Sequence, residues 1–302
     1  MKKKLALLFA AMVIVAVFSA LITSAADLKS KSNMDKKDKI SILATFYPVY
    51  MIGLNLTDQI DNIELNSLTD INTGCLHDYQ LTTEDMKRIA SADILIMNGG
   101  GMESFLDDIT AEYPNLKIID TSQGITMLPN DVWELGGIEV EGSVNAHVWL
   151  DPELYQKQIE NVRDGIVDFI AASRNDNREL EQAVKQNAQI YLDKVKELDV
   201  KLENLKESML KTDSADKEQV IIFHNAFAYL ADRIELKIAY TVPIDEDTAL
   251  SAGDIARIVD KVKTDKIRLL FTEKQFGDTI ANRIEAETDA KVYIIDSAVT
   301  GD

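Results

Sequence analysis

The chain of 302 residues contains only one cysteine and three histidines. The single cysteine, Cys75, excludes an internal disulfide, so a packed core has to hold the fold together. The sequence has neither a His-Glu-x-x-His nor a Gly-x-Ser-x-Gly motif, the signatures of many zinc peptidases and of α/β hydrolases. Basic residues are also few, with 32 Lys and Arg against 51 Asp and Glu and a formal net charge of −19. This charge repels nucleic acid and attracts cations.

The chain begins with an export signal. Lys2 to Lys4 precede an apolar run from Leu5 to Ile22, which predicts a signal peptide over residues 1–26. The length of the run leaves an uncleaved membrane anchor as the alternative, and no cysteine follows that would accept a lipid. Because residues 1–26 hold three lysines and no acid, the remaining chain carries a formal charge of −22 instead of −19. We expect an exported protein, in the periplasm or at the outer face of the cytoplasmic membrane, with 27–38 as a flexible tether.

From Lys39 onward, short apolar runs alternate with amphipathic stretches. This alternation predicts an α/β protein of two lobes, each with a roughly four-stranded, mostly parallel sheet flanked by helices. The predicted strands are 40–46, 63–68, 94–97 and 116–119, then 220–223, 237–240, 267–271 and 292–295. Helices are predicted from Thr82 onward and at 226–234, 252–263 and 277–288. The glycines of Asn98–Gly101 lack the spacing of a phosphate-binding motif and predict a tight turn.

A helical region separates the two lobes. It runs from Pro152 to about Lys211 with one interruption near 173–177, and its second part has apolar residues at spacings of three and four. A helix of about 30 residues and about 45 Å is too long for one lobe, so we interpret it as a rigid connector, with an exposed coiled-coil segment as the alternative. The predicted division is therefore an N-terminal lobe at 39–150, a helical region at 151–217 and a C-terminal lobe at 218–302.

All three histidines lie where a strand gives way to a helix or loop. His77, His147 and His224 fall at such positions, where ligands gather in parallel α/β sheets. Neutral imidazole is the commonest protein ligand for a transition metal, so three histidines in equivalent positions indicate a metal site. Asp296 ends the last predicted strand and is either a fourth ligand or a turn residue. A fourth protein ligand would leave no site for a reactive water.

Five segments resemble the ZnuA/TroA-like metal-binding proteins of bacterial ABC importers. The most specific are His147-Val-Trp-Leu-Asp-Pro152 and Phe223-His-Asn-Ala-Phe-Ala-Tyr-Leu-Ala-Asp-Arg233. The others are His77-Asp-Tyr-Gln-Leu-Thr, the run from Ala92 to Glu103, and Phe271-Thr-Glu273. The resemblance covers nearly the whole chain after residue 38. It implies two lobes joined by a long helix, little hinge motion, and a metal site in the cleft between the lobes.

The resemblance also implies the ligands and the function. His77, His147, His224 and Asp296 are the expected ligands, two from each lobe. The expected function is to capture a divalent metal outside the membrane and deliver it to an ABC permease, as a monomer. Nitrogen ligands favour Zn²⁺, whereas the Asp296 oxygen leaves Mn²⁺ or Fe²⁺ as alternatives.

The sequence departs from this family in three places. Residues 128–144 are acidic but contain no histidine, so a metal-gathering role is doubtful for them. Cys75, two residues before His77, is interpreted as a small packed residue instead of a ligand. The sequence ends at Asp302, where similar proteins continue into a last helix, which indicates a truncated C-terminal lobe.

Two other functions compete with metal transport. A zinc-dependent hydrolase or lyase would use three histidines and a metal-bound water, but Asp296 as fourth ligand would block it. Glu273 is expected to support the site or the fold instead of acting as a base. A surface adhesin is compatible with export. We expect no enzymatic activity.

Overall fold

The computed structural model describes residues 39–76, 79–106, 112–130, 144–173, 177–210, 219–242, 251–273 and 278–301. The predicted signal peptide, its alternative as an anchor, and the tether lie outside these residues. The chain divides into two compact units. We call them the β1–β4 unit, which takes its described residues from 39–126, 152–198 and 298–301, and the β5–β8 unit, which takes them from 127–151 and 199–297.

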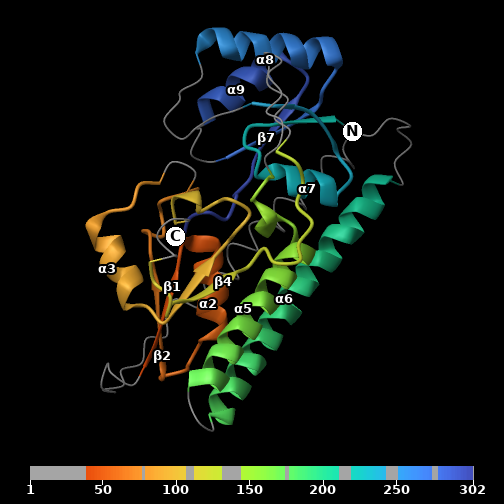
Figure 1. Ribbon diagram of the computed structural model, residues 1–302. Coiled ribbons are helices and arrows are strands. Elements are labelled where there is room, and N and C mark those ends of the chain that lie inside the picture. Colours follow the sequence, from red (N-terminus) through yellow and green to blue (C-terminus); the bar gives the residue numbers. More distant parts are fainter. Residues whose placement is uncertain are drawn as a thin grey trace. The chain divides into compact units, whose positions relative to one another are not determined.

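The β1–β4 unit contains a parallel sheet of four strands in the order β2-β1-β3-β4. The strands are β1 (Ile40–Ala44), β2 (Ile63–Ser67), β3 (Ile94–Met97) and β4 (Lys117–Asp120). The helical elements are α2 (Tyr47–Leu56), α3 (Thr83–Ser91), η2 (Ser104–Leu106), α5 (Pro152–Ser173) and the first part of α6 (Arg178–Leu210). Figure 1 shows α2 and α3 beside the strands of this unit.

The β5–β8 unit repeats the same strand order as β6-β5-β7-β8, again entirely parallel. Its strands are β5 (Gln219–Ile222), β6 (Lys237–Thr241), β7 (Leu269–Thr272) and β8 (Lys291–Ile294). Its helical elements are η3 (Val148–Leu150), α7 (Phe227–Arg233), α8 (Ala252–Asp265), α9 (Asp278–Glu287) and the last part of α6.

Alternation along β5 explains why residues 220–222 of this strand are all apolar. Val220 and Ile222 pack in one buried cluster with residues of α6 and α7, whereas Ile221 packs in another with residues of α8 and α9. Successive side chains of a strand point to opposite faces, and both faces of this sheet are covered. The predicted α/β class is therefore confirmed, and the eight predicted strands lie within two residues of the observed ones at each end.

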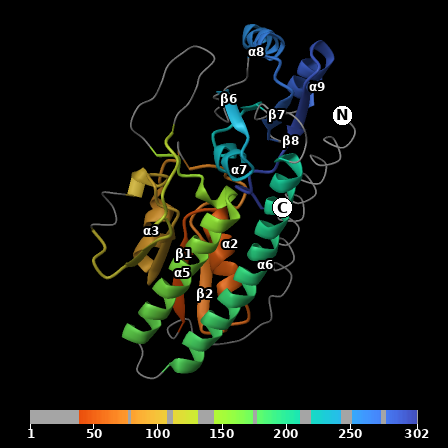
Figure 2. The same ribbon diagram turned by 90° about the vertical axis from the view of Figure 1, so that its right-hand side faces the viewer.

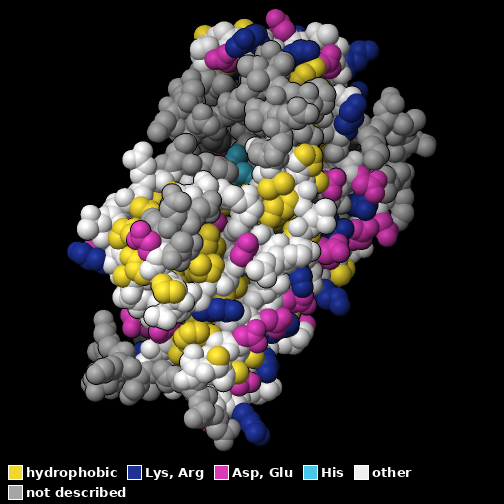
Figure 3. Space-filling view, viewed as in Figure 1, with side chains coloured by type: hydrophobic (Ala, Val, Ile, Leu, Met, Phe, Trp, Pro, Cys, Tyr) yellow, Lys and Arg dark blue, Asp and Glu magenta, His cyan; other side chains and the backbone are white. Residues whose placement is uncertain are grey.

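The long helix is α6, with 33 residues. Its length corresponds to about 50 Å. Residues 178–198 belong to the β1–β4 unit and 199–210 to the β5–β8 unit, so the predicted helical connection between the lobes is confirmed. Figures 1 and 2 both show α5 alongside the first part of α6. On the face drawn in Figure 3, acidic and basic side chains intermingle over this region instead of separating into patches.

Two features differ from the sequence analysis. The helix α2 was not predicted, because seven of its ten residues are buried and it has no polar stripe that would mark a helix. The described residues 127–130 and 144–151 group with the β5–β8 unit, whereas the sequence placed 39–150 in one lobe. In the part of the chain that the structure describes, no helix has the length and apolar character needed to cross a membrane.

The strand order determines where a ligand can be held in each unit. In the first sheet the chain passes from β1 to β2 on one side and then crosses to β3 on the other side of β1. In the second sheet it passes in the same way from β5 to β6 and then to β7. Loops leave in opposite directions at such a switch point, which opens a crevice at the carboxyl ends of the two central strands. The residues that follow β5 and β7 are therefore well placed to form a site.

Candidate metal site

His224 lies at the switch point of the β5–β8 sheet. It is the second residue after β5, and its carbonyl oxygen accepts a hydrogen bond from the Phe227 amide at 3.1 Å as α7 begins. Glu273 directly follows β7, the neighbouring central strand, and is 3% exposed. The Glu273 Oε1 atom lies 2.6 Å from the Nδ1 atom of His224. The strand order thus brings together two side chains that are 49 residues apart.

This contact determines which nitrogen of His224 can bind a metal. A carboxylate accepts hydrogen bonds, so Nδ1 of His224 carries the proton that it donates to Glu273. The lone pair of the neutral ring then lies on Nε2. In metal sites a ligating histidine commonly donates its other ring N–H to a carboxylate. This hydrogen bond fixes the orientation of the ring and raises the basicity of the nitrogen that binds the metal.

His147 is held in the same way by an amide. Its Nδ1 atom lies 2.7 Å from Oδ1 of Asn145, and its backbone amide donates to the same oxygen at 3.1 Å. The Asn145 side-chain nitrogen donates to the carbonyl of Asn225 at 2.9 Å, which fixes the orientation of the amide group. His147 therefore also donates through Nδ1 and carries its lone pair on Nε2. Both Asn145 and His147 are buried.

The two imidazoles lie next to each other. Their ring centroids are 4.8 Å apart in an edge-to-face arrangement, and their potential ligand nitrogens lie within 4.8 Å of each other. Trp149 packs against His147 at 5.1 Å between centroids, and its indole nitrogen donates to the carbonyl of Ser297 at 2.8 Å. Two oriented imidazoles at this separation offer two of the nitrogen ligands that a transition-metal ion requires.

The other predicted site residues are placed as follows. His77 lies outside the described residues. Asp296 is exposed and follows β8 by two residues, in the same unit as the paired histidines. Cys75 is a partly buried cysteine of the β1–β4 unit. His147, expected from the first lobe, belongs to the β5–β8 unit together with His224. The four-ligand set therefore stays a prediction.

The glycine turn at Asn98–Gly101 binds an internal carboxylate. Glu103 is 1% exposed and accepts hydrogen bonds from the backbone amides of Asn98 and Gly99, at 2.8 and 3.0 Å, and from the Thr45 hydroxyl at 2.7 Å. Burial raises the pKa of the Glu103 carboxyl to about 7, although these hydrogen bonds act to lower it. The amides that would cradle a phosphate are thus taken up by the protein itself, in agreement with the predicted tight turn.

Sequence reasoning missed the residues that hold His147. Tyr229 of α7 donates its hydroxyl to the Asn145 carbonyl at 2.6 Å and accepts from the Leu128 amide at 3.1 Å. Asn225 receives the Asn145 side chain. Asn225 precedes α7 by two residues and accepts through its backbone carbonyl, which every residue type has. Its residue type therefore gave no signal, and its partner Asn145 is 80 residues away in the chain.

The fold and the paired histidines define a two-lobed, metal-binding solute-binding protein. Residues 42–302 match the family model described as "ZnuA: Zinc-uptake complex component A periplasmic". The chain belongs to this family. The resemblance identified from the five sequence segments is therefore confirmed.

Individual relatives bind different metals. The chain is 28% identical over 291 residues to the iron-binding protein YfeA of Yersinia pestis, covering 95% of this chain and 87% of that protein. It is 26% identical over 301 residues to the manganese ABC transporter substrate-binding lipoprotein PsaA of Streptococcus mitis, covering 96% and 88%. The Zn(II)-bound ZnuA-like domain of Streptococcus pneumoniae AdcA has the same fold, with 22% identity, a TM-score of 0.69, and coverage of 87% and 89%.

Family membership sets the general role of the protein. It is a metal-binding, substrate-binding component of an ABC importer, which acts outside the cytoplasm with a membrane permease as its partner. The family consists of solute-binding proteins for metal transport, not of enzymes. These conclusions agree with the expectations for function, catalysis and location.

Proposed function

We propose that the protein captures Zn²⁺ as a monomer and delivers it to its permease. The observation that carries this proposal is the pair His147 and His224, whose rings adjoin while each donates through Nδ1 to a fixed oxygen acceptor. Both rings are thereby set in the tautomer that offers Nε2 to a metal. His77 and Asp296 are proposed to complete a set of three nitrogens and one carboxylate.

The ligand chemistry supports zinc over the other metals. Imidazole suits zinc, whereas manganese prefers sites richer in oxygen. Three neutral imidazoles and one carboxylate would reduce the charge of a bound Zn²⁺ to about +1. Mn²⁺ or Fe²⁺ is the second candidate, because the Asp296 oxygen suits these harder ions and relatives are named for manganese and for iron.

Pre-set imidazoles favour tight capture of the cargo. Burial of Asn145 and Glu273 keeps the two acceptors in place before a metal arrives. Little side-chain ordering then has to accompany binding, so more of the interaction energy appears as affinity. The same oriented ligands also restrict the coordination geometry, which contributes to selectivity.

The first test is to remove each paired histidine. His147→Ala and His224→Ala should each weaken Zn²⁺ binding by more than about 100-fold, because loss of a ligand exceeds the 10- to 100-fold cost of losing its partner. Affinity is measured by competition with a chromophoric chelator. Glu84→Ala, an exposed change in α3, serves as the control and should bind as the unmodified protein does.

The remaining assignments need separate measurements. His77→Ala and Asp296→Ala test the two proposed ligands, and unchanged zinc binding in either variant would remove that residue from the set. Competition between Zn²⁺ and Mn²⁺ at equal free concentrations tests the cargo. Preferential occupancy by manganese would overturn the choice of zinc. Fe²⁺ is compared with Zn²⁺ in the same way under anaerobic conditions.

A further inference from the structure

Arg233, the last residue of α7, is linked to both segments that carry the paired histidines. His224 precedes α7, and His147 precedes η3 and Asp151. Arg233 Nε lies 4.0 Å from Asp151 Oδ1, so one cation joins the end of α7 to the segment of His147. All of these residues belong to the β5–β8 unit.

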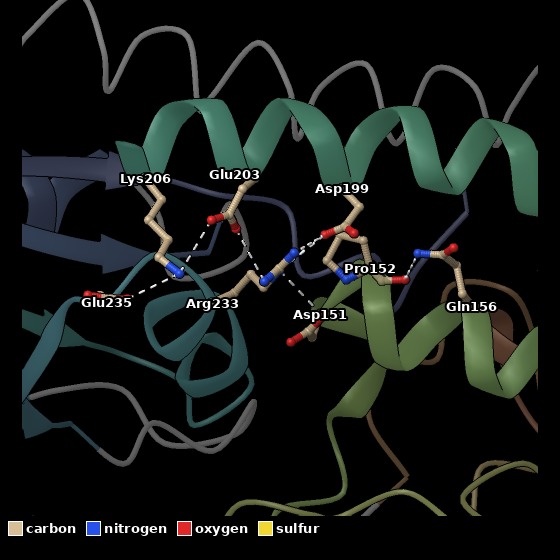
Figure 4. A network of polar contacts seen from close by, with 8 residues as sticks. All are labelled: Asp151, Pro152, Gln156, Asp199, Glu203, Lys206, Arg233 and Glu235. Carbon is tan, nitrogen blue, oxygen red and sulfur yellow. Dashed lines mark hydrogen bonds and ion pairs between the residues drawn. The ribbon is translucent and has the colours of Figure 1, made fainter. Parts of the chain in front are cut away.

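Arg233 also anchors this pair to α6. Its Nε atom donates to Asp199 at 3.1 Å, a second guanidinium nitrogen pairs with the same carboxylate, and Nη1 lies 3.4 Å from Glu203. Figure 4 shows the guanidinium between these two side chains of α6, with Asp151 on its other side. Lys206 extends the network to Glu203 at 3.6 Å and to Glu235 at 3.1 Å (Figure 4).

A regular spacing along α7 connects the network to the site. Tyr229 and Arg233 of α7 are four residues apart and therefore lie on one face of the helix, and Asn225 precedes α7 by two residues. Asn225 accepts from the Asn145 side chain, Tyr229 donates to the Asn145 carbonyl, and Arg233 pairs with Asp151. Two side chains of α7, together with the backbone carbonyl of Asn225 just before it, thus contact the segment around His147.

We propose that Arg233 is a positioning residue for metal binding, which fixes the segment of His147 against α7 and thereby sets the separation of His147 and His224. The inference rests on the proposed metal site. Arginine suits this position because its planar guanidinium can serve several carboxylates at once, whereas lysine is a single point charge. The side chains of Arg233, Asp151 and Asp199 are between 14% and 19% exposed, so water screens them less than it screens a surface pair.

Replacement of Arg233 by an uncharged residue removes the cation that pairs with both Asp151 and Asp199. The two carboxylates would then repel each other across the position that Arg233 occupies. Repulsion would displace the segment between Asn145 and Asp151, and with it the imidazole of His147. Asn145 and Tyr229 would still hold the start of this segment, so metal binding should weaken instead of disappearing.

The experiment compares Arg233→Met and Arg233→Lys with Arg283→Met. Arg283 pairs with Glu287 on the surface of α9 in the same unit and provides a matched loss of one arginine. Zn²⁺ affinity should fall roughly tenfold in Arg233→Met, less in Arg233→Lys, and not at all in Arg283→Met. Urea denaturation of the metal-free variants identifies the conditions in which each is folded. If Arg233→Met is unfolded under the conditions of the binding assay, the zinc affinity of Arg233→Lys tests the inference.

Two further readouts separate positioning from general stability. The visible absorption of bound Co²⁺ reports ligand geometry, and it should change in the folded Arg233 variants but not in Arg283→Met. Adding Asp151→Asn to Arg233→Met should recover part of the affinity, because it removes one of the two repelling charges. Zinc affinity and a cobalt spectrum like those of Arg283→Met would overturn the inference. Failure of the unmodified protein to bind zinc would instead overturn the proposed function.

Discussion

The two units place a buried glutamate at the same point of the same topology and use it differently. In the β1–β4 unit, Glu103 lies at the ends of β1 and β3, where it accepts from Thr45 and from two backbone amides. In the β5–β8 unit, Glu273 lies at the ends of β5 and β7, where it meets the imidazole of His224. One carboxylate stabilises a turn, and the other orients a proposed metal ligand.

The difference comes from the residues that follow the first central strand. Thr45 directly follows β1 and supplies a hydroxyl. His224, the second residue after β5, supplies an imidazole. Both units therefore have the same switch point in their strand order, but in the described residues only the β5–β8 unit places adjacent histidines there. Topology provides the location, and a few loop residues determine whether it becomes a site.

Exchanging either glutamate for alanine tests this comparison with the largest expected effects. Glu273→Ala should weaken Zn²⁺ binding by about 10- to 100-fold, because His224 loses the acceptor that orients its ring. Glu103→Ala should leave zinc affinity within about twofold but lower the free energy of unfolding by about 3 kcal/mol, because three buried donors lose their acceptor.

Chelator competition gives the affinities, and urea denaturation of the metal-free proteins gives the stabilities. Glu84→Ala is the control for both measurements, since it removes an exposed carboxylate of α3. A loss of zinc affinity in Glu103→Ala as large as in Glu273→Ala would mean that the two glutamates do not have separate roles.

Much of the fold was predictable because most strands contain a short, separate group of apolar residues. Every element whose period or composition is distinct was located, including α6, whose apolar spacing persists over many turns. The helix α2 was not, since Tyr47–Leu56 is buried on most sides and follows β1 almost directly. A helix without a polar face cannot be recognised by its periodicity.

The proximity of His147 and His224 was predictable, and the residues that hold them were less so. Scarcity and strand-end positions singled out His147 and His224, which the structure brings together. Asn145 and Arg233 gave no comparable signal, because the residue that fixes the Asn145 amide and the carboxylates that Arg233 contacts are far away in the sequence. Such contacts follow from the packing of α6 and α7, which local patterns do not specify.

Changing the pH tests the same comparison with a smaller effect. Burial raises the pKa of Glu103 from 4.5 to about 7, so the folded protein binds this proton more tightly than the unfolded chain does. The resulting stabilisation is fully present below pH 4.5 and is lost as the pH rises through 7. Relative to Glu103→Gln, which cannot titrate, the metal-free protein should lose up to about 3 kcal/mol across this range.

Urea denaturation of both proteins at several pH values measures this difference. The comparison with Glu103→Gln removes the contributions of all other titrating groups that the two proteins share. Parallel stability profiles would show that Glu103 keeps the same protonation state in the folded and unfolded protein, and would contradict the prediction.

The smallest expected effect concerns the helix starts of the two units. In both α3 and α8 a hydroxyl and an aspartate cap the first turn reciprocally, through Thr82 and Asp85 or through Ser251 and Asp254. Asp85 is 4% exposed and also accepts from the Tyr79 hydroxyl at 2.9 Å, whereas the contacts of Asp254 are exposed. Thr82→Ala should therefore lower the free energy of unfolding by about 1 to 2 kcal/mol, and Ser251→Ala by less.

Denaturation of the two alanine variants and of Thr82→Ser measures the difference. Serine keeps the hydroxyl that accepts from the Asp85 amide at 3.2 Å and donates to its carboxylate at 2.7 Å, so it should restore most of the stability. Equal losses in Thr82→Ala and Ser251→Ala would show that burial adds nothing to the cap. A larger loss at Thr82 that serine repairs would show that the β1–β4 unit depends on buried polar contacts at its helix start as well as at its switch point.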